Sequence, residues 1–211
     1  MIRLDFSNGR GALIDTRAAR RRLASAMESV FGPDGTYGVF VRSDTNVEDL
    51  PGFTGAGLNK TIPNVVGFEN VLAAIPRVWA SPFSKRAFAW RQSHMDLPQH
   101  VYASVLILRS VPSQKSGVMV TRDIDTGEKG WLSVAVNEGV GGAVDGQAAE
   151  SLRINVKTGE VRMLAQATAP WRRVLNPDGG VDKALVAGAD TVLKADEIEQ
   201  LIHLAQDLPQ R

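Results

Sequence analysis

Apolar residues recur at helical spacing near both ends of the chain, and shorter apolar runs bounded by turn residues lie between them. Helical spacing with capping and stopping residues predicts four helices. These cover Thr16–Phe31, Phe68–Trp79 with an interruption near Pro76, Phe83 to about Gln92, and Asp196–Leu208. The short runs predict six strands. These cover Tyr37–Val41, Tyr102–Val111, Gly117–Thr121, Trp131–Val136, Glu150–Val156 and Glu160–Gln166. Helices with one strand, then a β-rich half and a last helix, predict an α+β fold with a mainly antiparallel sheet.

The connections divide the chain further. Turns are expected at Asp125–Gly127 and Lys157–Gly159, and a loop at Pro170–Gly180. From Ser43 to Asn64 the periodicity disappears, and a stretch of this length without structure inside a compact domain is usually functional. The spacing of apolar residues changes from helical to strand-like after Pro98. We therefore expect one domain over residues 1–211, with possible lobes over 1–98 and 99–211.

Composition narrows the class of protein. The 211 residues are 44% hydrophobic and 22% charged, which suits one globular domain or two closely packed lobes. A net charge of +1 implies no general electrostatic partner such as nucleic acid or a membrane. The absence of cysteine excludes thiol catalysis, cysteine zinc sites and disulfides. Apolar runs are too short to span a bilayer and the N-terminus has no signal-peptide core, so we expect a cytoplasmic protein.

Familiar catalytic motifs are missing. The three histidines, His94, His100 and His203, have no metal-ligand spacing, and the chain has neither a nucleophile elbow nor a lysine-containing phosphate loop. The glycine-rich segment Gly139–Gly146 leaves two interpretations open. It is a connection between strands or a backbone wall close to a ligand, and we favour the connection because such turns commonly need positive φ.

The segment Val41–Phe53 is the most informative. Arg42 stands at the end of a predicted strand, where a glycine-punctuated loop begins. Its guanidinium is always charged and has five donors, so it is suited to hold a phosphate, with loop amides and hydroxyls such as that of Thr61 closing over the anion. A structural salt bridge from Arg42 to Glu48 or Asp49 is the alternative.

The same segment, read with Gly55–Gly57 and Asn64-Val65, resembles the nucleotide-binding domain of the phosphoenolpyruvate synthase and pyruvate phosphate dikinase family. The wider family includes the rifampicin phosphotransferases and the glucan water dikinases. The resemblance covers roughly residues 37–170. It continues, in order, at Val78–Ser81, Arg86–Arg91, Val111-Pro112, Ser116–Thr121 and Gly139–Gly146.

The resemblance implies an ATP-grasp fold, in which ATP lies between two lobes. It also implies transfer of phosphate from ATP to a histidine on a separate domain, which passes it to an acceptor. By position in the motif, Arg42 would hold the ATP phosphates, and Gly57 and Thr61 would contact the nucleotide. The full-length enzyme would use magnesium with ATP.

The departures from the family pattern concern catalysis. The chain has no Gly-Gly-Lys motif before Arg42, and Leu108 stands where family members carry a glutamine. Neither the Asp-x-Glu pair that holds magnesium nor the following Gln-x-Arg-Pro strand has a match, and His94 lacks the glycine setting of the phosphoacceptor. We therefore expect a partial domain, inactive alone, whose phosphohistidine and acceptor domains belong to the full-length protein. A non-catalytic nucleotide-binding or interaction module, or a structural domain without a ligand, is the alternative.

Overall fold

The computed structural model describes residues 1–5, 17–47, 49–50, 53–54, 59–142, 146–186, 188 and 191–208. Contacts divide the chain into two compact units. The first comprises Met1–Val111 with Leu175–Val181, and the second comprises Pro112–Val174 with Asp182–Arg211.

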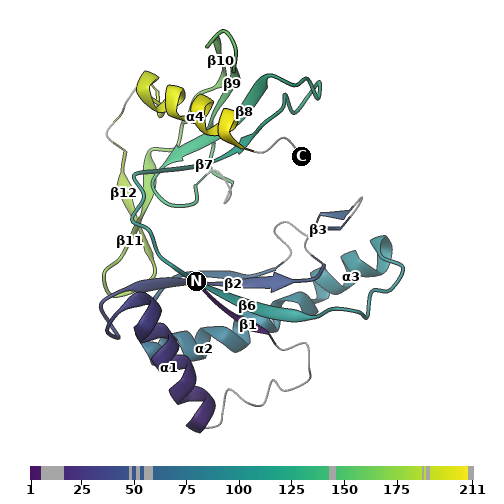
Figure 1. Cartoon of the computed structure of the whole chain (residues 1–211), viewed down its shortest axis with the longest axis vertical. Coiled ribbons are helices and arrows are strands. Elements are labelled where there is room, and N and C mark those ends of the chain that lie inside the picture. The colour runs from purple at the N-terminus through teal and green to yellow at the C-terminus, as the bar shows by residue number, and fades with distance from the viewer. Residues whose placement is uncertain are drawn as a thin grey trace. The chain divides into compact units, whose positions relative to one another are not determined.

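The first unit is built on a four-stranded antiparallel sheet in the order β1-β6-β2-β5. Its strands are β1 (Ile2–Asp5), β2 (Gly38–Thr45), β5 (Thr61–Val66) and β6 (Ala103–Arg109). Helices α1 (Arg17–Phe31) and α2 (Phe68–Trp79) pack on one face of this sheet (Figure 1). The smaller elements are β3 (Asp49–Leu50), β4 (Phe53–Thr54), η2 (Ser81–Phe83) and α3 (Lys85–His94).

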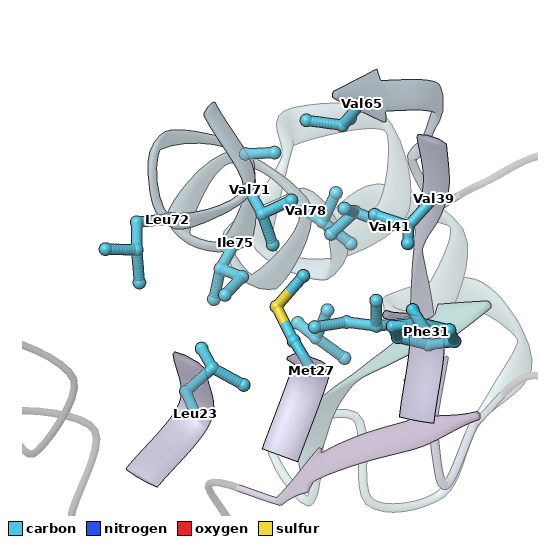
Figure 2. Packing of buried hydrophobic residues seen from close by; sticks show 13 residues of the cluster. Leu23, Met27, Phe31, Val39, Val41, Val65, Val71, Leu72, Ile75 and Val78 are labelled. Carbon is cyan, nitrogen blue, oxygen red and sulfur yellow. The ribbon is translucent and has the colours of Figure 1, made fainter. Parts of the chain in front are cut away.

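The core of the first unit lies between those two helices and the sheet. Leu23, Met27 and Phe31 are the buried residues of α1 and recur every four positions, so they form one apolar stripe. Figure 2 shows the Met27 side chain reaching from α1 toward the side chains of α2. The strand β2 contributes Val39 and Val41, both fully buried. Alternation along β2 therefore sends the even-numbered side chains to the opposite face of the sheet.

The helix α3 is held by a buried cation. It buries Ala87 and Arg91, while its other residues are exposed. The Arg91 guanidinium donates to the carbonyl oxygens of Pro82 and Pro98, and burial lowers its pKa from the usual value. Arg91 thus ties the two ends of the 82–98 segment together.

The second unit contains a four-stranded antiparallel sheet in the order β10-β9-β8-β7. Its strands are β7 (Lys115–Val120), β8 (Trp131–Glu138), β9 (Glu150–Asn155) and β10 (Val161–Ala165). Helix α4 (Ala195–Asp207) packs its apolar side on buried residues of β8 and β9. Strands β11 (Trp171–Leu175) and β12 (Val181–Leu185) form a separate two-stranded ladder.

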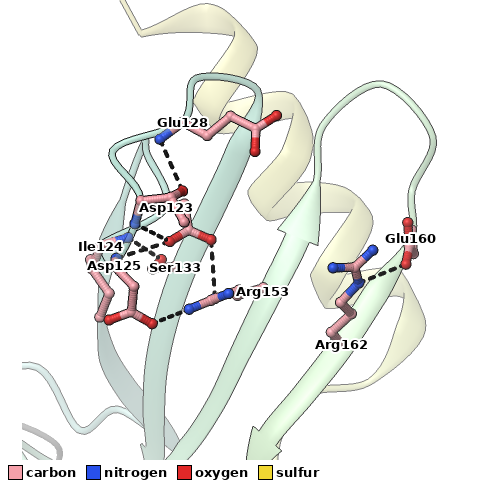
Figure 3. A network of polar contacts seen from close by, with 9 residues as sticks. Asp123, Ile124, Asp125, Glu128, Ser133, Arg153, Glu160 and Arg162 are labelled. Carbon is pink, nitrogen blue, oxygen red and sulfur yellow. Dashed lines mark hydrogen bonds and ion pairs between the residues drawn. The ribbon is translucent and has the colours of Figure 1, made fainter.

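A polar network fixes the connection between β7 and β8 (Figure 3). The Asp123 carboxylate accepts hydrogen bonds from the backbone N–H groups of Asp125 and Thr126, each at 2.9 Å, and pairs with the Arg153 guanidinium at 3.1 Å. Arg153 also bonds to Asp125. The backbone hydrogen bonds, led by that of Thr126, hold the pKa of Asp123 below its usual value. The expected turn at Asp125–Gly127 is therefore confirmed as an ion-paired loop.

The α+β prediction is confirmed, and all four expected helices are present. The interruption expected near Pro76 is wrong, because α2 runs unbroken from Phe68 to Trp79 with Pro76 inside it. The expectation of one sheet after Pro98 is wrong, because β6 pairs with β1 and β2 while β7–β10 form a second sheet. For the same reason the two compact units divide after Val111 rather than at Pro98. Strand β1 was not expected. No strand was expected over Ser43–Asn64, which contains β3, β4 and most of β5, or over Pro170–Gly180, which contains β11. In the part of the chain that the structure describes, no helix is long and apolar enough to cross a membrane.

Candidate functional site

Arg42 lies in the middle of β2 with an exposed side chain, between the buried residues Val41 and Ser43. Its cross-strand partners are Leu106 on β6 and Thr61 on β5. Thr61 is exposed as well. Directly opposite residues share a face of an antiparallel sheet, with Cβ atoms about 5 Å apart. The structure therefore brings two of the three predicted site residues together, on the face opposite α1 and α2.

The third predicted residue, Gly57, lies outside the described residues. The side chains of Glu48 and Asp49, the alternative partners of Arg42, lie outside them too. Among the side chains that are described, no ion pair engages Arg42.

Apolar side chains flank Arg42 on its face of the sheet. Phe40 lies two residues before it on β2 opposite Leu108, and Leu106 lies opposite Arg42 itself. All three apolar side chains are half-buried. An always-charged guanidinium and a hydroxyl beside an apolar surface suit a ligand that has both phosphates and a ring. Leu108, which replaces the glutamine of the family pattern, thus lies within two register positions of Arg42.

The glycine-rich connection belongs to the second unit. It joins β8 to β9, as the favoured interpretation of the sequence expected, and Gly139, Gly141 and Gly146 all have positive φ. The Gly139 N–H donates to the Gln114 carbonyl at 2.6 Å. Residues 143–145 lie outside the described residues, and a ligand-facing role for the segment stays a prediction.

The histidine that partly matches the phosphoacceptor motif contacts neighbouring residues of its own helix. His94 ends α3, and its ring stacks on Trp90 with the centroids 4.2 Å apart. Its Nδ1 lies 2.9 Å from the Trp90 carbonyl oxygen and 2.7 Å from Ser93 Oγ. Over the described residues, no three His, Cys, Asp or Glu side chains gather to hold a metal ion, and we assign no metal ligand.

Sequence reasoning missed a pocket of about 470 Å³ in the first unit. It lies where β2 begins and β6 ends. The lining residues are Gly35, Thr36, Tyr37, Gly38, Asn64, Val66, Arg109, Ser110, Leu175, Asn176 and Pro177. Arg42 and Thr61 are not among them. Its wall comes from segments up to 142 positions apart, which no local pattern joins.

Comparison with known proteins identifies the family to which the chain belongs. Residues 16–211 match the family described as pyruvate phosphate dikinase, AMP/ATP-binding domain, and the chain belongs to this family. Among relatives, it is 35% identical over 136 residues to a rifampicin phosphotransferase of Streptomyces sp, covering 64% of this chain and 16% of that protein. It is 29% identical over 178 residues to the rifampicin phosphotransferase of Bacillus subtilis, covering 84% of this chain and 20% of that protein. It is 30% identical over 162 residues to the phosphoenolpyruvate synthase of Pyrococcus furiosus, covering 76% of this chain and 20% of that protein. The chain thus spans a fifth or less of the length of these relatives.

Proposed function

We propose that this chain is the ATP-binding part of a phosphotransferase of the phosphoenolpyruvate synthase and pyruvate phosphate dikinase type. The full-length enzyme would transfer phosphate from ATP to a histidine on another domain, which would pass it to an acceptor. Membership of the AMP/ATP-binding domain family supports this proposal, as do relatives named phosphoenolpyruvate synthase and rifampicin phosphotransferase.

The observation that carries the proposal is the Arg42–Thr61 pair on the sheet face opposite α1 and α2. Arg42 would bind the ATP phosphates through a fork of N–H donors, and the Thr61 hydroxyl would add a further donor. Gly57 would let the loop backbone approach the nucleotide closely. Phosphoryl transfer depends mainly on positioning and on stabilising charge, which a guanidinium supplies without changing its protonation.

The chain would be part of an ATP-grasp fold, with the phosphohistidine and acceptor domains elsewhere in a cytoplasmic protein. Magnesium would accompany ATP in the full-length enzyme and neutralise charge on the phosphates. Neither nucleic acid nor a membrane is a partner in this proposal.

A non-catalytic nucleotide-binding module of the same fold is the second candidate. The observation favouring it is Leu108, which places an apolar side chain near Arg42 where the family pattern has a glutamine. A module of this kind would bind ATP through the same arginine but would transfer no phosphate.

Both candidate functions require the chain to bind ATP through its phosphates. Calorimetric titration of the chain with ATP, AMP and adenosine, with and without Mg²⁺, tests this requirement. We expect ATP to bind more tightly than adenosine, and the difference to shrink with salt because an exposed arginine is screened within about 10 Å at 0.1 M. Equal affinity for ATP and adenosine would contradict a phosphate clamp. Formation of phosphohistidine from ATP by the full-length protein then separates the enzyme from the module.

A further inference from the structure

The pocket at the end of the first sheet is separate from the Arg42 surface. Its lining residues all belong to the first unit. Along β2, Gly38 in the pocket lies four residues before Arg42, a separation of about 13 Å at the usual rise of a strand. A volume of about 470 Å³ falls within the range of small-molecule sites.

One residue assembles this pocket. Asn64 is 3% exposed, and its side-chain N–H groups donate to the carbonyl oxygens of Asn176 at 2.7 Å and Gly180 at 2.8 Å. Its own carbonyl accepts the Gly180 N–H at 2.7 Å. Three hydrogen bonds therefore fix the 176–180 turn, which continues the wall formed by Leu175, Asn176 and Pro177.

Asn64 adopts a backbone conformation that is unfavourable for most residues. Its φ is +48°, and it is the one described residue other than glycine with a positive φ. A side chain at position 38 would collide with it, since a Cβ on Gly38 would lie 1.9 Å from Asn64 Oδ1. Strained residues held by their surroundings are concentrated at ligand sites, so this arrangement points to a built pocket rather than an accidental gap.

The polar lining of the pocket includes one charged residue and one buried hydroxyl. Arg109 is the only charged residue among the described residues that line it. Its guanidinium lies over the Tyr37 ring, 5.9 Å from the centroid, and donates to the Phe31 carbonyl. The Ser110 hydroxyl is buried and has no hydrogen-bond partner among the described residues. Burial, followed by the charge of Asp34, raises the pKa of Tyr37, so its phenol keeps its proton near neutral pH.

Apolar groups complete the lining. Val66, Leu175 and Pro177 supply an apolar wall beside the donors. We infer that this pocket binds a small organic anion, a carboxylate or a phosphate monoester on a compact apolar body, at a site independent of the ATP phosphates. The Arg109 guanidinium and the Ser110 hydroxyl bind the anionic group, and Asn64 is the positioning residue that holds the wall.

Titration of the ¹⁵N-labelled chain with phenyl phosphate, benzoate and neutral benzamide tests the inference by NMR. We expect saturable shifts at the amides of Gly35, Gly38 and Ser110 with at least one of the two anions, and at least tenfold weaker binding of benzamide. Shifts with phenyl phosphate alone identify a phosphate monoester site, and shifts with benzoate alone a carboxylate site. Failure of both anions to bind, or equal binding of all three probes, would overturn the inference.

Variants separate this site from the nucleotide site. Arg109→Gln should weaken binding of the anion about tenfold or more, as expected for loss of a charge-assisted hydrogen bond. Arg109→Lys keeps the charge and should retain part of the affinity. Arg77→Gln removes an exposed cation on α2 and should change nothing. If Arg42→Gln weakened the anion as much as Arg109→Gln, or if saturating ATP displaced it, the separate site would be refuted while ATP binding stood.

Discussion

At position 38 the packing around β2 leaves no room for a side chain. A Cβ there would lie 1.9 Å from Asn64 Oδ1 and 3.3 Å from Ser110 Oγ. Asn64 cannot swing aside without losing its two hydrogen bonds to the 176–180 turn. We therefore predict that Gly38→Ala lowers the free energy of unfolding by about 1–3 kcal/mol, as overpacking does. Denaturant unfolding measures this, and Asn64→Gly in the same chain should relieve part of the cost. An equal cost in both backgrounds would contradict the collision.

The charge state of Glu197 affects how the start of α4 is held. Its carboxylate accepts hydrogen bonds from Lys115 Nζ at 2.6 Å and from the Lys194 N–H at 2.7 Å. The Lys115 hydrogen bond, followed by that of Lys194, holds the pKa of Glu197 below its usual value of 4.5. A lowered folded-state pKa means that this stabilisation is complete above the unfolded pKa. It is lost as pH falls through the folded-state value.

Glu197→Gln should therefore destabilise the chain by about 1 kcal/mol at neutral pH, the usual scale for a half-exposed ion pair with a hydrogen bond. The difference from the unmodified chain should shrink below about pH 4.5, as the Glu197 carboxylate takes up a proton. Thermal unfolding at pH 7 and pH 3.5 measures the destabilisation at neutral pH and its decrease in acid. Glu199→Gln, an exposed change on the same helix, is the control. A difference that did not depend on pH would show that the charge of Glu197 is not involved.

At the scale of elements, α4 is attached to the second sheet by a buried carboxylate. Glu150 begins β9, is 1% exposed, and accepts the N–H groups of Val192 at 2.6 Å and Leu193 at 2.9 Å. Glutamine at this position would accept one N–H and present its own N–H₂ to the other. Glu150→Gln should cost about 1–3 kcal/mol, the penalty for a buried donor without an acceptor. A loss of stability no larger than that of Glu199→Gln, in the same denaturant titration, would refute this role for the Glu150 carboxylate.

The elements that sequence reasoning found are those whose burial is periodic. In α1 the apolar positions Leu23, Met27 and Phe31 follow one stripe, and in β9 buried and half-buried residues alternate. Strand β5 was missed because Pro63 and Asn64 interrupt its alternation, and the register of β2 and β5 shifts between Val39 and Val41.

The candidate sites divide in the same way. Arg42 could be identified from its residue type and the motif around it, although it lies in the middle of β2 and not, as the sequence predicted, at the end of a strand where a loop begins. Its pairing with Thr61 follows from the β2–β5 ladder. The pocket at Asn64 could not be predicted, because hydrogen bonds across 112 and 116 positions form its wall. Long-range polar contacts leave no periodic signal in a single sequence.

At the scale of the whole molecule, the described residues form two hydrophobic cores that share no residue. Met27 is 1% exposed in the first core, and Leu132 is 1% exposed in the second. Truncating either to alanine should cost about 2–5 kcal/mol, because each would leave a cavity. Hydrogen exchange should show the loss of protection at β2 and β6 for Met27→Ala, and at β8 and β9 for Leu132→Ala. Identical exchange patterns for the two variants would contradict two separate cores.

Binding of the ATP phosphates by the Arg42 guanidinium is tested most directly by ATP affinity and melting temperature. Calorimetry would measure both for Arg42→Lys, Arg42→Ala and the control Arg77→Lys. We predict that both Arg42 variants bind ATP about tenfold or more weakly with little change in melting temperature, because an ammonium cannot replace a two-pronged guanidinium. Arg77→Lys should bind ATP normally. Unchanged ATP affinity with a lowered melting temperature in the Arg42 variants would contradict the claim and make Arg42 a structural residue.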